Sequence, residues 1–336
     1  MTSVEQAADA IGAGGMVVVV DEADAQTPGH VVLGAQRATA EAITFLTRRA
    51  GGWIGLALAP ERCDELGLRV MSLRPEAVRD TPFTVTIEAR DGVTTGISTA
   101  DQAHTIRTAA DPAKGRADIV VPGHVRPLKA RAGGVLERAG HIEASVDLAR
   151  LAGLAPAGVI CPVRNEDGSV AGLGELDGFV RRHGLPAVTI ADLIAHRRRH
   201  ERLVERVGTT ALATAFGRFA VHGYRSLVDD RQHVALVKGD VAGVAGVLVR
   251  VHAGCLAGDV LRSLGCDCAA RLESALTLIE AEGAGVLLYL GQHGFGGHHP
   301  REAPDVRDAG VAIQILAELG VSSSCHNAPL RVVSEL

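Results

Sequence analysis

In the first half of the chain, short apolar runs alternate with stretches in which apolar residues recur at helical spacing. That spacing predicts a helix over Val4–Ala13, and the β-branched run Met16–Val20 is typical of a buried strand, with a polar loop at Asp21–His30 after it. The same patterns predict strands at Val31–Leu33, Trp53–Leu58, Phe83–Ile87, Ile119–Val121 and Gly158–Val163, and helices at Thr39–Arg49 and Gly134–Leu154. Alternating strands and helices indicate an α/β to α+β layered domain that ends near residue 200.

A basic stretch with helical character, Asp192–Val207, follows this domain. Its arginines could contact phosphate or RNA, but Glu201 and Glu205 interleave with them, and this favours a solvated amphipathic connector. The predicted domains are therefore residues 1–200 and 208–336. In the second domain we expect a helix and four strand-like runs: Ala269–Glu282 for the helix, and Ala211–Val221, His233–Val237, Val247–Val251 and Gly285–Leu290 for the strands.

Three of the six cysteines lie close together in the second domain. Cys255, Cys266 and Cys268 can supply three corners of a tetrahedral zinc site, which leaves the fourth position for water, as in catalytic zinc centres. The alternative is that they are small apolar residues packed beneath a helix, since free cysteine is often buried. A Cys-x-Cys pair with a third cysteine upstream favours the metal site.

Composition narrows the class of protein. A chain of 336 residues with 47% hydrophobic and 22% charged residues is typical of a soluble protein of about two domains. The net charge of −5 and the 3% aromatic content argue against nucleic-acid or membrane-surface binding. The acidic start of the chain does not resemble a signal peptide, and no apolar run approaches the ~20 residues of a membrane helix. Unpaired cysteines at metal-like spacing predict a cytoplasmic protein.

Motifs in both halves resemble one protein family. The first half carries TTGIST, PGHVRPLKAR and GGVLERAGHIEASVDLARLAGLAPAGVIC, and the second carries HVALVKGD, RVHAGCLAGDVLRSLGCDC and DVRDAGVAIQILAELGV. The chain resembles the bifunctional riboflavin-synthesis proteins, in which 3,4-dihydroxy-2-butanone 4-phosphate synthase is fused to GTP cyclohydrolase II. This resemblance covers nearly the whole chain. It implies a small-molecule, nucleotide-like substrate and a homodimer formed through the synthase-like half.

The synthase-like half departs from the family at its acid and base residues. The resemblance implies an acidic loop, DDEDRENEGDL, whose Glu binds Mg²⁺ together with a histidine that corresponds to His141. Here Gln26 stands in place of that Glu, Ala25 in place of the Arg and His30 in place of the Asp, while Pro162 replaces a later catalytic Glu. Because Mg²⁺ prefers anionic oxygen, this half is expected to be inactive toward ribulose 5-phosphate. Three kept positions could still hold an anion, or form a polar cleft without function: Thr105, His124 and Arg138.

The cyclohydrolase-like half keeps more of its family's machinery. In the family, zinc-bound water opens the purine ring and expels formate, while an arginine attacks the α-phosphorus and a neighbouring Asp accepts a proton. The resemblance assigns zinc to the three cysteines, the two catalytic roles to Arg307 and Asp305, and a triphosphate contact to Arg250. The alternative for Arg307 is a solvated arginine at a helix start, paired with Asp308.

Nucleotide recognition in this half has changed. The family's REGRG-like turn, whose Glu reads the guanine edge, is GQHGFGG here, with His293 and Phe295 at the Glu and Arg places. Imidazole cannot accept the two guanine N–H bonds that a carboxylate accepts. Arg271 replaces a nucleotide-contacting Gln, Gly254 replaces a Glu, and tyrosine is absent after Tyr289. We expect Arg250, Arg271 and His293 to contact a nucleotide or another anion.

A histidine cluster appears where the guanine site is lost. It consists of His293, His298 and His299, with His326 further on. One of these residues could close the zinc site as a fourth ligand, which would make the metal structural. The cluster could instead bind a second metal or an anion, or be a surface loop of biased composition.

These features lead to two hypotheses from different classes. The first is a divergent bifunctional homologue with an inactive synthase half, whose second half uses Zn²⁺ to hydrolyse a nucleotide or related heterocycle. The second is a non-catalytic or repurposed paralogue that keeps the fold and a structural zinc. Zn²⁺ is the cofactor expected in both, and Mg²⁺ is the cation that the synthase resemblance adds.

Overall fold

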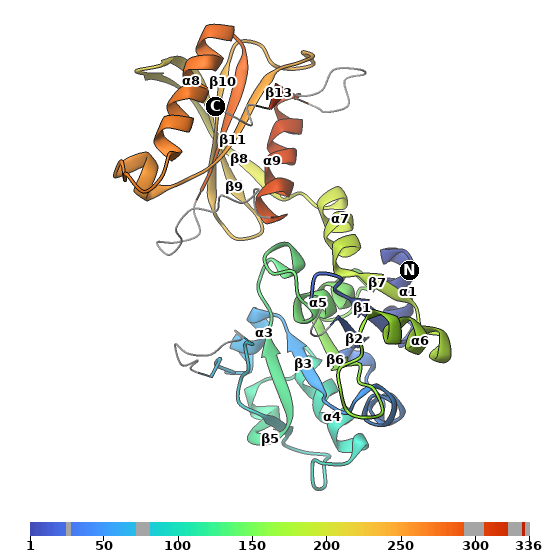
Figure 1. The fold of residues 1–336 in the computed structure, drawn as a ribbon. Coiled ribbons are helices and arrows are strands. Elements are labelled where there is room, and N and C mark those ends of the chain that lie inside the picture. The colour runs from blue at the N-terminus through green and yellow to red at the C-terminus, as the bar shows by residue number, and fades with distance from the viewer. Residues whose placement is uncertain (25–27, 72–80, 292–305, 322–330, 333–336) are drawn as a thin grey trace. The chain divides into compact units, whose positions relative to one another are not determined.

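The chain folds into two compact units, Met1–Arg199 and His200–Leu336 (Figure 1). The computed structural model describes residues 1–24, 28–71, 81–291, 306–321 and 331–332; the side chains of residues 306–308, 331 and 332 are outside that description. Each unit is a mixed sheet with helices packed on it, so the expected two-domain α/β to α+β architecture is confirmed. None of the described helices combines the length and apolar character needed to cross a membrane.

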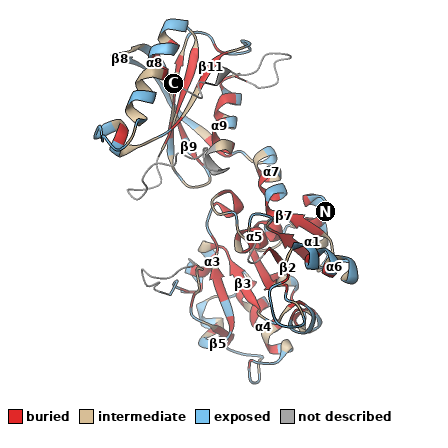
Figure 2. Ribbon diagram, viewed as in Figure 1, coloured by how far each residue is buried: buried red, intermediate tan, exposed pale blue. Residues whose placement is uncertain are grey.

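Unit 1 is built on a seven-stranded sheet with the order β4-β5-β3-β6-β2-β1-β7. β1 pairs in parallel with β7, and β3 with β5, whereas the other neighbours are antiparallel. The strands are β1 Val17–Val20, β2 Gly29–Gly34, β3 Gly55–Leu58, β4 Ile87–Ala89, β5 Ile119–Lys129, β6 Ala157–Pro162 and β7 Ala187–Thr189. All four valines of β1 are buried, because helices or loops cover both faces of the central strands (Figure 2).

The helices of unit 1 pack against this sheet, and the amphipathic ones bury an apolar stripe there. In α1 the stripe consists of Val4, Ala7, Ala8 and Ile11, and Ser3 begins the helix with a capping box. The helices are α1 Val4–Gly12, α2 Ala40–Phe45, α3 Pro60–Glu65, α4 Thr99–Ala110, α5 His141–Leu151, α6 Leu173–His183 and α7 Ile190–His200. Short helical turns add η1 Ala35–Arg37, η2 Leu46–Ala50, η3 Arg116–Asp118 and η4 Gly134–Leu136.

Several predicted elements of unit 1 have different bounds: the strand expected at Phe83–Ile87, for example, is β4 at Ile87–Ala89. The helix expected over Gly134–Leu154 is the short turn η4 followed by α5, which begins only at His141. The strand expected at Ile119–Val121 continues through Pro122 to Lys129, because its later residues pair with β3. The basic connector is amphipathic as expected, with Asp192 and Arg199 exposed, and its other face is buried in unit 1 through Ile190, Leu193, Ile194 and Arg197.

Unit 2 is a six-stranded sheet with the order β13-β11-β12-β10-β9-β8. Its strands are β8 Val204–Thr214, β9 Gly217–Ser226, β10 Gln232–Lys238, β11 Leu248–Ala253, β12 Gly285–Leu290 and β13 Arg331–Val332. The helices are α8 Cys268–Glu282 and α9 Val306–Glu318, with the short π-turn η5 at Leu256–Val260. Apolar residues of α8, among them Ala275, Leu276 and Ile279, pack with Phe219, Leu248 and Leu287 of the sheet.

Two predictions for this half are wrong at a boundary. The run Ala211–Val221 is not one strand but a hairpin, with a turn at Ala215 and Phe216 between β8 and β9. The helix expected to reach Val207 ends at His200, and β8 begins at Val204, because these residues pair with β9.

Candidate functional site

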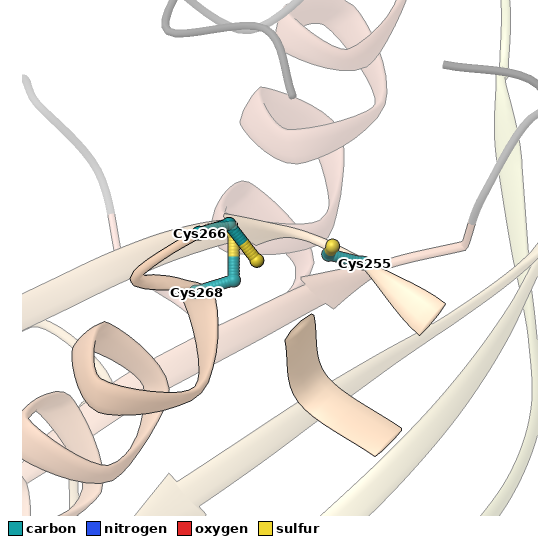
Figure 3. Close-up of side chains that lie close together, drawn as sticks. All are labelled: Cys255, Cys266 and Cys268. Atoms are coloured by element: carbon teal, nitrogen blue, oxygen red, sulfur yellow. The ribbon is translucent and has the colours of Figure 1, made fainter. Parts of the chain in front are cut away.

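The three cysteines converge at one end of α8. Their sulfur atoms all lie within 4.8 Å of one another, and each residue is partly buried. Figure 3 shows Cys266 and Cys268 on one turn that leads into α8, with Cys255 approaching from the end of β11. Three thiols from two separate segments are thus close enough to share one metal ion.

Gly258 provides the space in which the sulfurs meet. Its backbone N–H donates a hydrogen bond to Cys255 Sγ over 3.1 Å. A Cβ atom at this position would lie 2.6 Å from Cys266 Sγ and 2.8 Å from Cys268 Cβ. Because such approaches are shorter than normal contacts, only glycine fits here without moving the cysteines.

We therefore expect Gly258→Ala to weaken metal binding. The added methyl would displace the turns that carry Cys266 and Cys268, and we expect roughly a 10- to 100-fold loss of zinc affinity, the range typical of changes just outside the ligands. Competition with a chromophoric chelator measures the zinc affinity of each variant. Gly208→Ala is the matched control, because a Cβ there meets nothing within 4 Å. Equal zinc affinity in both variants would contradict the assigned role of Gly258.

A buried hydrogen-bond network holds the loop that carries Cys255. Asp259 Oδ2 accepts hydrogen bonds from the Cys255 backbone N–H over 2.7 Å and from the Tyr289 hydroxyl over 2.9 Å. His252 Nε2 lies 3.0 Å from both Asp259 oxygens, and its ring stacks on Tyr289 with 5.5 Å between ring centroids. The side chains of His252 and Asp259 are 3% and 4% exposed. This network fixes the backbone of Cys255 relative to β11 and β12.

The electrostatics of the cysteine cluster favour a bound cation. Burial, followed by the neighbouring Cys255, raises the pKa of the Cys268 thiol to about 12. Three thiols so close together cannot all lose their protons unless a positive charge compensates them. A divalent metal supplies that charge and binds the thiolate form. Three convergent thiolates are a donor set that fits zinc.

Two arginines lie beside the cysteine cluster. Arg250 is on β11, and Arg271 is on α8, where its Nε donates to Asp267 Oδ2 over 2.8 Å. Burial lowers the pKa of Arg250, and the positive charge of Arg271 lowers it further. Arg271 is thus paired with a carboxylate, and both guanidinium groups lie close enough to the cysteine cluster for Cys268 and Asp267 to act on the charge of Arg250.

In unit 1, the three positions expected to hold an anion, Thr105, His124 and Arg138, all pair with carboxylates of the protein. His124 Nδ1 lies 2.7 Å from Glu88 Oε2, and Thr105 Oγ1 donates to the other oxygen of Glu88 over 2.9 Å. Arg138 Nη2 lies 2.6 Å from Oε1 of Glu143, which is completely buried. The charge of Arg138 is therefore already balanced within the protein.

The ring of His141 packs against that of His30. The two imidazole rings lie 4.0 Å apart between centroids, at an angle of 34°. His30 on β2 also pairs in register with Pro162 on β6, so these departures from the family pattern are neighbours in space. The synthase family's Mg²⁺ prefers anionic oxygen, and this pair of imidazoles does not fit it. Ala25 and Gln26 lie outside the described residues.

The two imidazoles predict a loss of stability in mild acid. Burial lowers the pKa of both rings, and the charge of His141 lowers that of His30 further. Below about pH 6.5 the unfolded chain takes up protons that the folded chain does not. The free energy of unfolding therefore falls with pH, by up to about 1.4 kcal/mol per pH unit for each ring, until the pH reaches the lowered pKa values.

Urea unfolding between about pH 7.5 and 5.5, with a chelator present, measures this slope. The fluorescence of Trp53, the only tryptophan of the chain, reports on unit 1. His30→Gln should reduce the slope because one titrating ring is removed. An identical slope in both proteins would show that His30 does not contribute.

Several predicted site residues lie outside the description. His293, Phe295, His298, His299, Asp305 and His326 are not among the described residues, and Arg307 is described only as part of the α9 backbone. Sequence reasoning assigned no role to His252, Asp259 or Tyr289. The signal was available, since His252 and Asp259 both lie in the conspicuous segment around Cys255, but their hydrogen bonds depend on the fold.

Comparisons with known proteins agree with this architecture. Residues 5–196 match the 3,4-dihydroxy-2-butanone 4-phosphate synthase family, and residues 205–325 match GTP cyclohydrolase II. The riboflavin biosynthesis protein RibBA of Salinispora arenicola is 46% identical over 344 residues, covering 96% of this chain and 82% of the relative. The chain belongs to the bifunctional riboflavin-biosynthesis protein family. RibBA of Aquifex aeolicus is also 46% identical, covering 99% of this chain and 88% of its own. The family resemblance expected from the motifs is therefore confirmed.

Solved structures resemble the whole chain and its first unit. RibBX, described as a two domain 3,4-dihydroxy-2-butanone 4-phosphate synthase from A. baumannii, is 36% identical with a TM-score of 0.84, covering 100% of this chain and 94% of its own. A 3,4-dihydroxy-2-butanone 4-phosphate synthase in complex with two magnesium ions is 34% identical with a TM-score of 0.56, covering 60% of this chain and 98% of its own. The two-unit architecture is thus shared within the family.

Proposed function

We propose that unit 2 is a zinc-dependent, cyclohydrolase-like hydrolase of a nucleotide or related heterocycle. The observation that supports this most is the convergence of three cysteine sulfurs within 4.8 Å of one another, next to Arg250 and Arg271. Zinc held there would supply hydroxide near neutral pH for attack on the ring. The protein binds small molecules in this proposal, as a cytoplasmic homodimer.

The side chains around the cysteines have different roles in this proposal. Arg250 and Arg271 bind the phosphates of the substrate and place its ring toward the cysteines. Asp259 holds the Cys255 backbone in position, with His252 and Tyr289 as its partners. From the family resemblance we assign attack on the α-phosphorus to Arg307 and proton acceptance to Asp305. GTP is a poor substrate in this proposal, since His293 replaces the carboxylate that reads guanine.

For unit 1 we propose that the ribulose 5-phosphate reaction is lost. The reaction needs acids and bases that move protons, and Mg²⁺ to stabilise negative charge. His30, His141 and Pro162 meet where the family pattern has carboxylates beside a histidine. Arg138 and His124 are already paired with Glu143 and Glu88. Unit 1 then serves as a scaffold and, by the family resemblance, as the dimerising half.

Turnover of a nucleotide panel tests the proposal for unit 2. The full-length zinc-loaded protein is incubated with GTP and other purine nucleotides, and mass spectrometry scores formate, pyrophosphate and the ring-opened product. Arg307→Ala should abolish pyrophosphate release while zinc content stays at one ion per chain. Arg218→Ala, an arginine on β9 of the same unit, is the matched control and should turn over normally.

The outcomes separate the two hypotheses. Turnover of GTP at the rate of an ordinary enzyme would show that His293 does not exclude guanine. Zinc binding without turnover of any nucleotide would overturn the hydrolase proposal in favour of the non-catalytic paralogue. X-ray absorption at the zinc edge would then show whether an imidazole is the fourth ligand, because a structural zinc site has four protein ligands.

A further inference from the structure

Cys255 and Cys268 bring two thiols together from separate parts of unit 2. Cys255 follows β11, Cys268 is the first residue of α8, and their side chains hydrogen-bond to each other. The sulfur atoms of the cysteine cluster all lie within 4.8 Å of one another (Figure 3). A disulfide bond is about 2.05 Å long, so a side-chain rotation with a small backbone shift can join two of these sulfurs.

The protein holds these two cysteines together by contacts of its own. The backbone N–H of Cys255 donates to Asp259 Oδ2 over 2.7 Å, and the helix that begins at Cys268 is fastened to the sheet by Ala275 and Ile279, which are completely buried. Neither contact involves a sulfur atom. The two thiols therefore stay neighbours whether or not a metal ion joins them.

The electrical charge of the cluster allows two stable states. Three neighbouring thiolates need a cation to balance their charge, and a divalent metal supplies it. A disulfide carries no charge, so it removes the need for a cation. Oxidants can also reach this cluster, because its three cysteines are only partly buried. By contrast, the other two described cysteines, Cys63 and Cys161, are completely buried in unit 1.

We propose that Cys255 and Cys268 form a redox switch, in which a reversible disulfide and a bound zinc ion exclude each other. A peroxide transfers one oxygen to the first thiol, which becomes a sulfenic acid, and one water leaves. The second thiol then attacks that sulfur: the S–O bond breaks, the S–S bond forms, and the hydroxyl leaves with the second hydrogen as water. Two thiols and one peroxide thus give one disulfide and two waters.

The switch determines whether unit 2 can take up zinc. Zinc binds cysteine as the thiolate, so the disulfide removes two of the three sulfur ligands and leaves Cys266 alone. Bound zinc in turn protects the sulfurs, because their lone pairs are shared with the metal. In the reducing cytoplasm proposed for this protein such a disulfide is transient. This inference rests on the zinc site of the proposed function, but not on the reaction that unit 2 catalyses.

Oxidation of the zinc-free, full-length protein with one equivalent of hydrogen peroxide tests the switch. Mass spectrometry should find the loss of two hydrogens, and a peptide map should join Cys255 to Cys268. Zinc affinity, measured by chelator competition, should fall at least about 100-fold, because two ligands are lost. Dithiothreitol should reverse both changes. Zinc-loaded protein should be oxidised at least about tenfold more slowly.

Serine variants identify the pair. Cys255→Ser should form no disulfide, whereas Cys266→Ser, the matched control, keeps both partners and should form it. If these variants fold poorly, the peptide map of the wild type still decides. A bond to Cys266 or Cys325 instead, no disulfide, or oxidised protein that binds zinc as tightly as the reduced form would overturn the switch. Reduced protein without zinc would instead contradict the zinc site of the proposed function.

Discussion

Cys268→Ser is expected to remove zinc from the protein. Serine offers a neutral hydroxyl in place of a thiolate, and the two remaining cysteines cannot hold the ion alone. We expect affinity to fall on the order of 1000-fold or more, since changes just outside a metal's ligands already cost 10- to 100-fold. Metal analysis after dialysis should find one zinc per chain in the wild type and almost none in the variant.

A matched control separates loss of a ligand from loss of a thiol. Cys161 is completely buried in β6 of unit 1, and burial raises the pKa of its thiol to about 11. Cys161→Ala should therefore keep a full complement of zinc. Thiol titration adds a second readout, because the three clustered cysteines should react with a thiol reagent only after chelation. Full zinc content in Cys268→Ser would rule out the cysteine cluster as the zinc site.

The elements that could be predicted best are those whose apolar pattern is continuous. The strand expected at Gly285–Leu290 has those bounds, because β12 lies inside the sheet and five of its six residues are buried. The hairpin within Ala211–Val221 is not predictable from its pattern, because Ala215 and Phe216 lack the Asn-Gly signal of a tight turn. Most residues of β8 are exposed, so its pattern shows no core face either.

In the site, too, the residues close in sequence could be predicted, whereas contacts between distant segments could not. Cys255, Cys266 and Cys268 are close in sequence, so their spacing alone predicted a shared metal. The contact of His30 with His141 depends on β2, β6 and α5 meeting, which no short motif encodes. The buried role of Arg197 was missed for the same reason: its neighbours in sequence are charged, while its partner is 50 residues away.

That partner makes Asp147→Ala the substitution with the largest expected effect on stability. Arg197 Nη1 lies 2.7 Å from Asp147 Oδ2, the backbone N–H of Val135 donates to the same oxygen over 2.8 Å, and the side chains of the pair are 9% and 1% exposed. Truncation leaves a buried guanidinium without its carboxylate partner, although Nη1 still donates to the Gly133 carbonyl over 2.9 Å, and it removes the acceptor of a buried N–H. We expect the free energy of unfolding of unit 1 to fall by about 3–5 kcal/mol, measured by urea unfolding with Trp53 fluorescence.

Two further variants show whether this loss of stability comes from the buried ion pair. Asp177→Ala breaks an exposed ion pair with Arg181 on α6 and should cost less than about 1 kcal/mol. The double variant Asp147→Ala with Arg197→Met should recover much of the loss, because no charge is then left buried. If Asp147→Ala lowers the free energy of unfolding as little as Asp177→Ala does, water reaches Arg197. The ion pair then does not stabilise the packing of α7 against α5. Since α7 leads along the chain into unit 2, a large cost shows that the segment before the second unit is held by the first.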